Sequence, residues 1–347
     1  MCGPVRAGKG NGMATIRDVA REAGVSPATV SRVLARPEVV TPDLREQVLQ
    51  VIERLGYAPH PIAASLKTRR TGKILVTVPD ISNPFFAKVI RGIEGVAVAA
   101  SYAVVLGDTR DLPEREELFG LMLKRGEVDG LIFLGHRLPK VIAALVQEAG
   151  GQAPVVNACE FNSELSVSSA HIDNRAAAEA AMDALYAAGH RHVAVLSGPA
   201  QSPLTRERLG GARASAQRHG ALAELQLLEG DFSLASGHAR MHELLQTQSK
   251  ATGIFCHNDE MAIGALAALR EWGLSCPDDV SVVGFDDIEM ASYVNPALTT
   301  IRQPMEQIGQ EAAQLLLDTI QNRDAPPRRV KLSWELVARG SLGAPAK

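Results

Sequence analysis

The stretch from residue 14 to residue 34 constrains the fold most strongly, because it predicts two short helices joined by a tight turn. Thr15 is placed to cap the first helix, with Asp18 three residues later in a variant of the capping box. Ser26 is placed to cap the second helix, with Pro27 at its first position. Apolar residues recur at helical spacing on one side of each segment. The pattern predicts a helix-turn-helix, whose second helix lies in the major groove of DNA.

Two further observations favour this interpretation over the alternative, a helical hairpin inside a larger core. A third helix is predicted from Pro42 to Leu55, closed by Gly56, so three helices can share a small core. The first 73 residues hold 12 Lys and Arg against 6 Asp and Glu, whereas the remaining residues hold 24 against 33. We therefore expect a polyanionic partner at the N-terminal end only.

From residue 73 onward, short runs of Val, Ile and Leu alternate with helical segments. Such runs, bounded by Gly, Asp or Pro, are typical of parallel strands that are covered by helices on both faces. The runs lie at 74–78, 103–107, 130–135, 154–158, 192–198, 225–232, 253–258 and 280–287, and helices are expected near 84–100, 114–125, 202–219, 236–246, 260–273 and 305–322. Two successive β/α units of this kind make two doubly wound lobes, with ligands expected between them, beyond the C-terminal ends of the strands.

Several motifs resemble the LacI/GalR family of bacterial transcription regulators, in the family's order and from Ile16 through most of the chain. They are VSPATVSRVL, GYAPHPIAASLKTRRTGKI, ISNPFF, HIDN, CHNDEMAIGAL and VVGFDDIEMASYVNPALTTI. The resemblance implies an N-terminal all-α helix-turn-helix head and an α/β, periplasmic-binding-protein-like sensor of two doubly wound parallel-sheet lobes. Within the family, PDISNPFF, HIDN and GDF are most similar to the cytidine-responsive repressors.

These motifs also predict the order of domains. Residues 1–13 are expected to be a disordered extension, 14–58 the helix-turn-helix domain, 59–72 a hinge helix or linker, and 73–347 the ligand-binding domain. Lobe 1 is expected to hold about 73–172 plus 302–330, and lobe 2 about 173–301 plus 331–343. The segment TTIRQP resembles the family's crossover, so the helix that follows it is expected to return to lobe 1.

The resemblance implies a set of DNA-binding residues: Thr15, Ser26, Pro27, Ala28, Thr29, Ser31, Arg32 and Leu66. In the second helix, Pro27 and Ala28 can offer only apolar contacts, for example to a thymine methyl, whereas Arg32 can pair with guanine. The hydroxyl residues Thr15, Ser26 and Ser31 are expected to hold phosphates, which sets register but carries no sequence information. Leu66 matches the leucine that family members wedge into the minor groove at the centre of the operator.

Polar and aromatic residues at the predicted strand ends would converge on the cleft between the lobes. The acceptors are Asp80, Asp108, Asn157, Glu160, Asn258, Asp259, Asp286 and Asp287, the donors are Arg206 and Arg208, and Phe85, Phe86 and Phe232 can sandwich a ring. For any single Asp, a role as helix cap or turn residue is the alternative.

The resemblance selects specific positions among these residues. Arg208, Asn258 and Asp286 match positions that commonly hold a sugar or nucleoside, and the three phenylalanines match pocket walls. Cys159 departs from the Asp or Asn usually found near its position. The effector-binding residues are therefore expected to be Asp80, Phe85, Phe86, Cys159, Arg208, Phe232, Asn258 and Asp286.

Other classes of protein find little support in the sequence. The four cysteines show neither CxxC nor Cys/His ligand spacing, so we expect no zinc site and no disulfide framework. There is no GxGxxG, GxxxxGK[ST] or GxSxG, so we expect no enzyme, cofactor or metal. The absence of a signal peptide and of a long apolar run predicts a cytoplasmic protein with no membrane partner.

The sequence as a whole predicts a ligand-responsive regulator, by resemblance a repressor, that binds a pseudo-palindromic DNA operator as a homodimer. A nucleoside such as cytidine, a base or a sugar in the cleft is expected to switch that affinity. The two-turn hinge helix would be marginal alone, so it could form on DNA and melt when the lobes close. The alternatives are a periplasmic-type solute-binding protein and a sugar or nucleoside enzyme built on the same lobes.

Overall fold

The computed structural model describes residues 14–57, 70–150, 152–162, 165–322 and 324–345. The chain divides between Thr71 and Gly72 into a small N-terminal unit and a larger C-terminal unit. The predicted extension 1–13 and most of the predicted hinge helix, with Leu66, lie outside the described residues.

The N-terminal unit is the predicted helix-turn-helix with a third helix packed across it. Thr15 and Asp18 form the predicted capping box, in which each side chain accepts from the other residue's backbone N–H. The Ser26 hydroxyl accepts from the backbone N–H of Thr29 at 3.1 Å. A shared core of buried valines and alanines joins the helices. The elements are α1 (Ile16–Glu22), α2 (Pro27–Ala35), the short 3-10 helix η1 (Pro37–Val39) and α3 (Pro42–Leu55).

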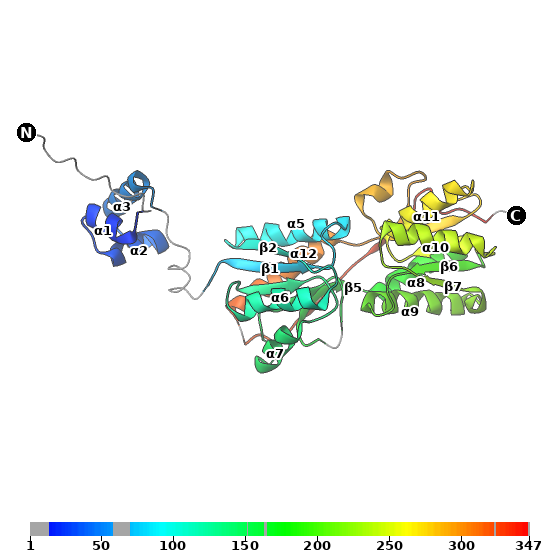
Figure 1. Cartoon of the computed structure of the whole chain (residues 1–347), viewed down its shortest axis with the longest axis horizontal. Coiled ribbons are helices and arrows are strands. Elements are labelled where there is room, and N and C mark those ends of the chain that lie inside the picture. Colours follow the sequence, from blue (N-terminus) through cyan, green and yellow to red (C-terminus); the bar gives the residue numbers. More distant parts are fainter. Residues whose placement is uncertain (1–13, 58–69, 151, 163–164, 323, 346–347) are drawn as a thin grey trace, which may run out of the picture. The chain divides into compact units, whose positions relative to one another are not determined.

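The first lobe of the C-terminal unit has a six-stranded parallel sheet among the described residues, in the order β11-β5-β4-β3-β1-β2. Helices α5 and α12 cover one face, and α6 and α7 cover the other (Figure 1). The elements are β1 (Lys73–Val78), α5 (Pro84–Ala99), β2 (Ala103–Asp108), α6 (Pro113–Lys124), β3 (Gly130–Phe133), α7 (Lys140–Glu148), β4 (Val155–Ala158), β5 (Ser168–Ile172), α12 (Met305–Gln321) and β11 (Arg329–Leu332).

The second lobe repeats this design, with described strands in the order β12-β10-β9-β8-β6-β7, of which only β12 is antiparallel to its neighbour. Helices α10 and α11 lie on one face, and α8 and α9 on the other (Figure 1). The elements are α8 (Asn174–Ala187), β6 (Val193–Ser197), α9 (Pro203–Arg218), η2 (Leu222–Glu224), β7 (Gln226–Glu229), α10 (Leu234–Gln246), β8 (Gly253–Cys256), α11 (Asp259–Glu271), β9 (Ser281–Asp286), η3 (Glu289–Ser292), β10 (Thr299–Arg302) and β12 (Glu335–Val337).

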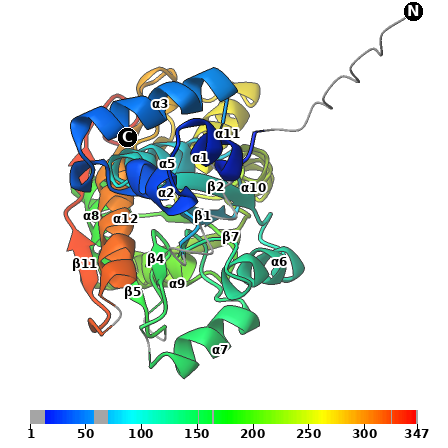
Figure 2. The same ribbon diagram turned by 90° about the vertical axis from the view of Figure 1, so that its left-hand side faces the viewer.

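The chain passes between the lobes three times, and the third passage corrects the sequence-based boundary. The helix after TTIRQP, α12, returns to the first lobe as predicted and lies against β3, β4 and β5 (Figure 2). The expected boundary between residues 330 and 331 falls inside β11, which pairs with β5 along its whole length. The crossing lies instead between Leu332 and Glu335, because β12 pairs with β10 of the second lobe.

Three longer elements were not anticipated from the sequence: α7, β5 and α8. All five residues of β5 are buried, although three of them are Ser or His, so the strand lacks the apolar run that predicts burial. None of the described helices combines the length and the apolar character that a membrane crossing needs.

Helices α5 and α12 approach each other backbone to backbone at two glycines. A Cβ atom added at Gly92 would lie 2.1 Å from the carbonyl oxygen of Glu306, and one added at Gly309 would lie 2.1 Å from that of Val89. Gly95, one turn from Gly92 on the same helix, has nothing within 4 Å of such an atom. The close approach brings α12 into the first lobe and so joins the two parts of that lobe.

We expect Gly92→Ala to lower the free energy of unfolding by about 2 kcal/mol or more, because the new methyl group must push two backbones apart. Gly95→Ala should raise it by about 0.5–1 kcal/mol, since alanine is the better helix former and meets no neighbour. Urea unfolding of both variants followed by circular dichroism measures the difference. Equal effects of the two substitutions would contradict this packing.

Candidate functional site

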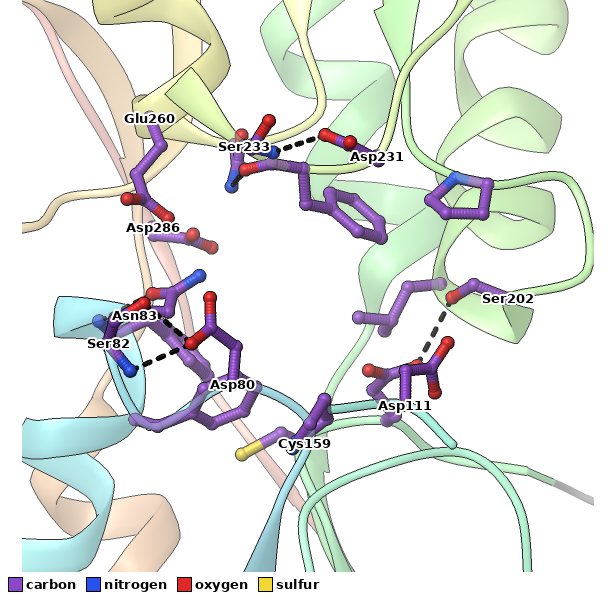
Figure 3. A pocket seen from close by; sticks show the side chains of 18 of the residues that line it. Asp80, Ser82, Asn83, Asp111, Cys159, Ser202, Asp231, Ser233, Glu260 and Asp286 are labelled. Carbon is purple, nitrogen blue, oxygen red and sulfur yellow. Dashed lines mark hydrogen bonds between the residues drawn. The ribbon is translucent and has the colours of Figure 1, made fainter. Parts of the chain in front are cut away.

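A cavity of about 810 Å³ lies between the two lobes, within the range that holds small-molecule ligands. Its walls come from loops that follow the C-terminal ends of β1, β2, β3 and β4 in the first lobe and of β6, β7, β8 and β9 in the second. Figure 3 shows acidic and aromatic side chains from both lobes around one open centre. The position is the one that doubly wound sheets favour for ligands.

The structure brings all eight predicted effector-binding residues to this cavity: Asp80, Phe85, Phe86, Cys159, Arg208, Phe232, Asn258 and Asp286. The Phe85 and Phe86 rings pack edge to face, with centroids 5.3 Å apart. The Asn258 amide caps α11 and also donates to the backbone oxygen of Phe232 at 2.7 Å, which holds the Phe232 loop against that helix. Whether these residues contact an effector stays a prediction.

The other polar residues that the sequence analysis named, which the family resemblance did not select, divide into two groups. Asp108 and Glu160 line the cavity, whereas Asn157, Asp259, Asp287 and Arg206 do not. The Asn157 amide is buried and donates to the backbone oxygens of Phe133 and Gly135. The Asp259 carboxylate accepts from the backbone N–H of Ile288 and from the Thr300 hydroxyl, so it links α11 to β10 and to the segment after β9 instead of lining the cavity.

A buried guanidinium organises the floor of the cavity. The Arg208 residue is only 3% exposed. Its Nε donates to Asn174 Oδ1 at 3.0 Å, Nη1 donates to the backbone oxygen of His257, and Nη2 lies 3.9 Å from Asp286 Oδ1. The guanidinium carbon also lies 3.7 Å from the centroid of the Phe285 ring. Because every edge of the group has a partner, its charge can remain in the interior.

Backbone strain is concentrated at the same place. Among the described residues, eight that are not glycine have a positive φ, and five of these line the cavity: Arg110, Asp111, Cys159, Phe232 and Asp286. Such conformations cost energy and persist where the surrounding structure enforces them, which is common at ligand-binding sites. This observation singles out the cavity without any reference to sequence resemblance.

The cavity is acidic, and burial raises the pKa of two of its carboxyl groups. Seven carboxyl groups line it: Asp80, Asp108, Asp111, Glu160, Asp231, Glu260 and Asp286. Burial raises the pKa of Asp286 to about 7, although Arg208 and the Gln303 amide, which donates at 2.7 Å, favour its charged form. Burial, with the nearby charge of Asp80, raises the pKa of Glu260 to about 6. Burial also raises the pKa of the Cys159 thiol, so that side chain stays neutral.

Sequence reasoning missed several lining residues, among them Asp111, His136, Ser202, Asp231, Glu260 and Gln303. Ser202 of the second lobe donates to Glu160 of the first at 3.2 Å, which joins the cavity's two walls. Asp231 and Glu260 each stand one or two residues from a predicted lining position, Phe232 and Asn258. Their closeness in the sequence to Phe232 and Asn258 is the signal that could have predicted them as lining residues.

The N-terminal unit presents the predicted DNA-reading residues on the surface of α2. Pro27, Ala28 and Arg32 are exposed, and Thr29 is partly exposed. Ser26 and Thr15 are exposed as well, but both serve as helix caps, and the Thr15 hydroxyl donates to Asp18 at 2.6 Å. The apolar partners Val30 and Val33 are buried on the opposite side of α2. The helix therefore has one face packed on its own core and one face open to solvent.

Comparison with known proteins identifies the family. Residues 15–60 match the model of bacterial regulatory proteins of the lacI family, and residues 182–342 match that of a periplasmic binding protein-like domain. The HTH-type transcriptional repressor CytR of Escherichia coli strain K12 is 39% identical over 341 residues, which cover 98% of this chain and 99% of CytR. The chain belongs to the LacI family of bacterial transcription regulators.

Solved LacI-family structures share the fold. The lac repressor dimer bound to operator and the anti-inducer ONPF matches with a TM-score of 0.85 and 28% identity, over 95% of this chain and 99% of that one. A LacI-family regulator from Enterococcus faecium with bound ribose matches with a TM-score of 0.71 and 32% identity, over 79% of this chain and 100% of that one. The protein is a ligand-responsive, DNA-binding regulator of transcription.

The raised pKa of Glu260 predicts a pH-dependent stability. A carboxyl group whose pKa is higher in the folded state stabilises the fold most below its ordinary pKa of 4.5, and this contribution is lost as the pH rises through 6. Glu260→Gln should therefore gain stability relative to the parent chain between pH 5 and pH 8. We expect about 1 kcal/mol, reduced from the full shift because Glu260 is only half buried.

Thermal unfolding of both proteins at the two pH values measures this change. Glu289→Gln, at an exposed position outside the cavity lining, is the matched control for the loss of one charge, and the gain between the two pH values should be larger for Glu260→Gln than for this control. A Glu260→Gln difference that stayed constant, or fell with rising pH, would show that Glu260 is not destabilised by its site.

Proposed function

We propose that this LacI-family protein is a repressor that binds a pseudo-palindromic operator as a homodimer, and that an uncharged sugar or nucleoside in the interlobe cavity switches its affinity for DNA. The observation that carries the proposal is the convergence of carboxylates, phenylalanines and one buried arginine on a single cavity in a chain with a helix-turn-helix head. The lac repressor, which resembles this chain over nearly its whole length, is a dimer on its operator.

The chemistry of the cavity favours a ring that carries hydroxyl groups. Carboxylates such as Asp80 and Glu260 can accept hydrogen bonds from hydroxyls, and the rings of Phe85, Phe86 and Phe232, which line the cavity, can contact a flat or apolar ring face. The structural relative from Enterococcus faecium holds ribose, and a nucleoside such as cytidine, the effector type suggested by sequence resemblance, contains ribose as well. We therefore place a ribose unit in the effector.

The charge of the cavity opposes a phosphorylated ligand. Seven carboxyl groups line it, whereas its described walls hold two guanidinium groups, on Arg110 and Arg208. Arg110 pairs with Asp108 at 3.2 Å, and Arg208 is held by Asn174, His257 and Asp286. A phosphate would therefore meet several negative charges at short range and compete for cations that are already engaged.

We expect cytidine to bind at least about 10-fold more tightly than cytidine monophosphate, and ribose at least about 10-fold more tightly than ribose 5-phosphate, because of this repulsion. Calorimetric titration of each pair, after a thermal-shift screen of nucleosides, bases and sugars, provides the measurement. Added salt should narrow the gap, since screening weakens repulsion between charges. Tighter binding of either phosphorylated compound would refute the assignment.

On the DNA side, we assign base reading to Arg32, with apolar contacts from Pro27 and Ala28. All three are exposed on the N-terminal part of α2 or one turn further along it. Ser26 and Ser31 would hold phosphates, Thr15 would do so by exchanging its hydrogen bond to Asp18 for one to a phosphate, and Thr29 would contribute a hydroxyl at the groove. The role of Leu66 as a minor-groove wedge stays a prediction, because it lies outside the described residues.

Arg32→Ala should relax the base preference at one position of each half-site and weaken operator binding by about 1–3 kcal/mol. Arg45→Ala, at an exposed position on α3, is the control and should leave the base preference unchanged. Binding of both variants to operator duplexes that carry each substitution in turn gives the result. Retained discrimination at every position in Arg32→Ala would remove Arg32 from base reading.

A regulator with this function works where the chromosome is, so we place the protein in the cytoplasm. The same assignment argues against the two alternatives. Binding and delivering a solute to a transporter does not require a basic helix-turn-helix unit. The relatives named above are transcription regulators rather than enzymes.

A further inference from the structure

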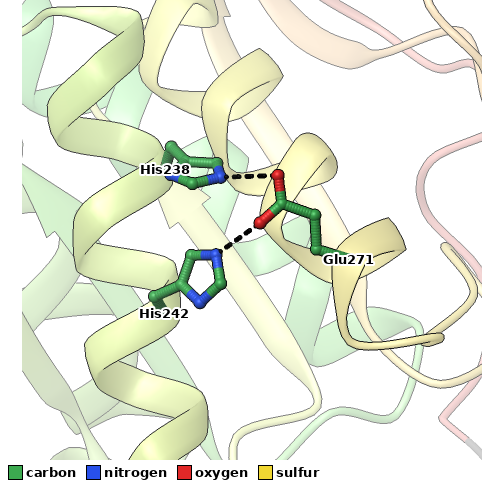
Figure 4. Close-up of side chains that lie close together, drawn as sticks. All are labelled: His238, His242 and Glu271. Carbon is green, nitrogen blue, oxygen red and sulfur yellow. Dashed lines mark hydrogen bonds and ion pairs between the residues drawn. The ribbon is translucent and has the colours of Figure 1, made fainter.

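Two histidines and a glutamate converge on the outer face of the second lobe, away from the cavity. His238 and His242 stand four residues apart on α10 and therefore project from the same side of the helix. Glu271 is the last residue of the neighbouring helix α11. Figure 4 shows its carboxylate between the two imidazole rings, with one oxygen directed at each.

The distances suit a shared ion. His238 Nε2 lies 3.1 Å from Glu271 Oε1, His242 Nε2 lies 2.8 Å from Glu271 Oε2, and the three ligand atoms all lie within 4.8 Å of one another. Ligand atoms at metal bonds of ~2.0 Å in a tetrahedral arrangement are about 3.3 Å apart. The side chains of His238, His242 and Glu271 are 34%, 27% and 56% exposed, so an ion and its remaining water ligands can reach them.

The helices that carry these residues are held tightly together. A Cβ atom added at Gly237 would lie 2.2 Å from the backbone oxygen of Met261, and one added at Gly264 would lie 2.1 Å from that of Leu234. Backbone contact at two points limits sliding of α10 against α11. The ligand atoms are thus positioned by rigid elements rather than by a loop.

We propose that His238, His242 and Glu271 form a binding site for a divalent transition-metal ion such as Zn²⁺, which would link α10 to α11. Two imidazoles with one carboxylate suit zinc, nickel or copper, whereas magnesium and calcium prefer sites made entirely of oxygen atoms. Three protein ligands leave a position open for water. The sequence signal is the His-x₃-His spacing, which a search for cysteine-based sites passes over.

Trp272 opposes the ion and gives the proposal a spectroscopic signature. Its indole N–H donates to His242 Nδ1 at 2.8 Å. While Nδ1 accepts this bond, the proton of the neutral ring sits on Nε2, the atom that would bind the metal. Metal binding therefore moves the proton to Nδ1 and breaks the hydrogen bond from the indole of Trp272, a residue that is 45% exposed.

The test is a calorimetric titration of the full-length protein with Zn²⁺ after treatment with a chelator. We expect saturable binding of one ion, weakened at least about 10-fold in His238→Gln and in His242→Gln. His219→Gln is the matched control, because His219 faces the carboxylate of Asp183 at 3.2 Å and, among the residues that the structure describes, belongs to no cluster of three possible metal ligands. It should bind Zn²⁺ as the parent chain does, and Mg²⁺ should not bind at this site.

Two further measurements guard against a variant that merely misfolds. Trp272→Phe should bind Zn²⁺ about 5-fold more tightly, because it removes the bond that competes for His242. Cu²⁺ should quench tryptophan fluorescence in the parent chain far more than in Trp272→Phe. The proposal is overturned if Zn²⁺ shows no saturable binding at millimolar concentration, if the two histidine variants bind like the parent, or if Trp272→Phe binds more weakly.

Discussion

The burial of one positive charge, that of Arg208, constrains the ligand-binding unit more than any other interaction. An uncompensated guanidinium in the interior would be strongly destabilising, so the folded second lobe requires all of its partners to be in place. Those partners come from three separate segments: Asn174 at the start of α8, His257 after β8, and Asp286 at the end of β9. The guanidinium therefore ties together the strand ends that form one wall of the cavity.

That constraint extends to the other lobe through Asp286. Its carboxyl group accepts a hydrogen bond from Gln303, which lies between β10 and α12 on the segment that crosses back to the first lobe. Ser202 and Glu160 make a second polar link across the cavity. A ligand that replaces or strengthens either link has a direct means of changing how the two lobes meet. Small polar changes here can therefore favour one arrangement of the lobes over another.

Much of this architecture was predictable from the sequence, for physical reasons. Runs of Val, Ile and Leu that end in Asp, Asn or Gly indicate buried strands and mark the ends at which ligands bind, so the positions of Asp80, Asn258 and Asp286 could be inferred. The helix-turn-helix was predictable because Thr15 and Ser26 can be identified as N-caps from the residues that follow them in the sequence. Contacts between residues far apart in the sequence were not predictable. Asn157 also stands at the end of an apolar run, yet its amide turns inward and donates to two backbone carbonyl groups.

The features that sequence reasoning missed depend on tertiary placement. Glu260 lines the cavity, whereas its neighbour Asp259 is buried against Thr300. Which of the two faces the cavity depends on how α11 is oriented about its own axis. β5 is buried although it carries Ser168, Ser169 and His171, because α12 returns to cover it. Likewise Glu271 meets His238 only because glycines bring α10 and α11 into contact.

The proposed function depends on coupling, within the same chain, between occupancy of the acidic cavity and binding of DNA. The most direct measurement is operator affinity in the absence and presence of saturating effector, together with effector affinity for the free and the operator-bound protein. Linkage requires the two ratios to be equal, and a coupling of about 5- to 150-fold is typical of allosteric proteins. An operator affinity that saturating effector leaves unchanged would contradict coupling between the cavity and DNA binding.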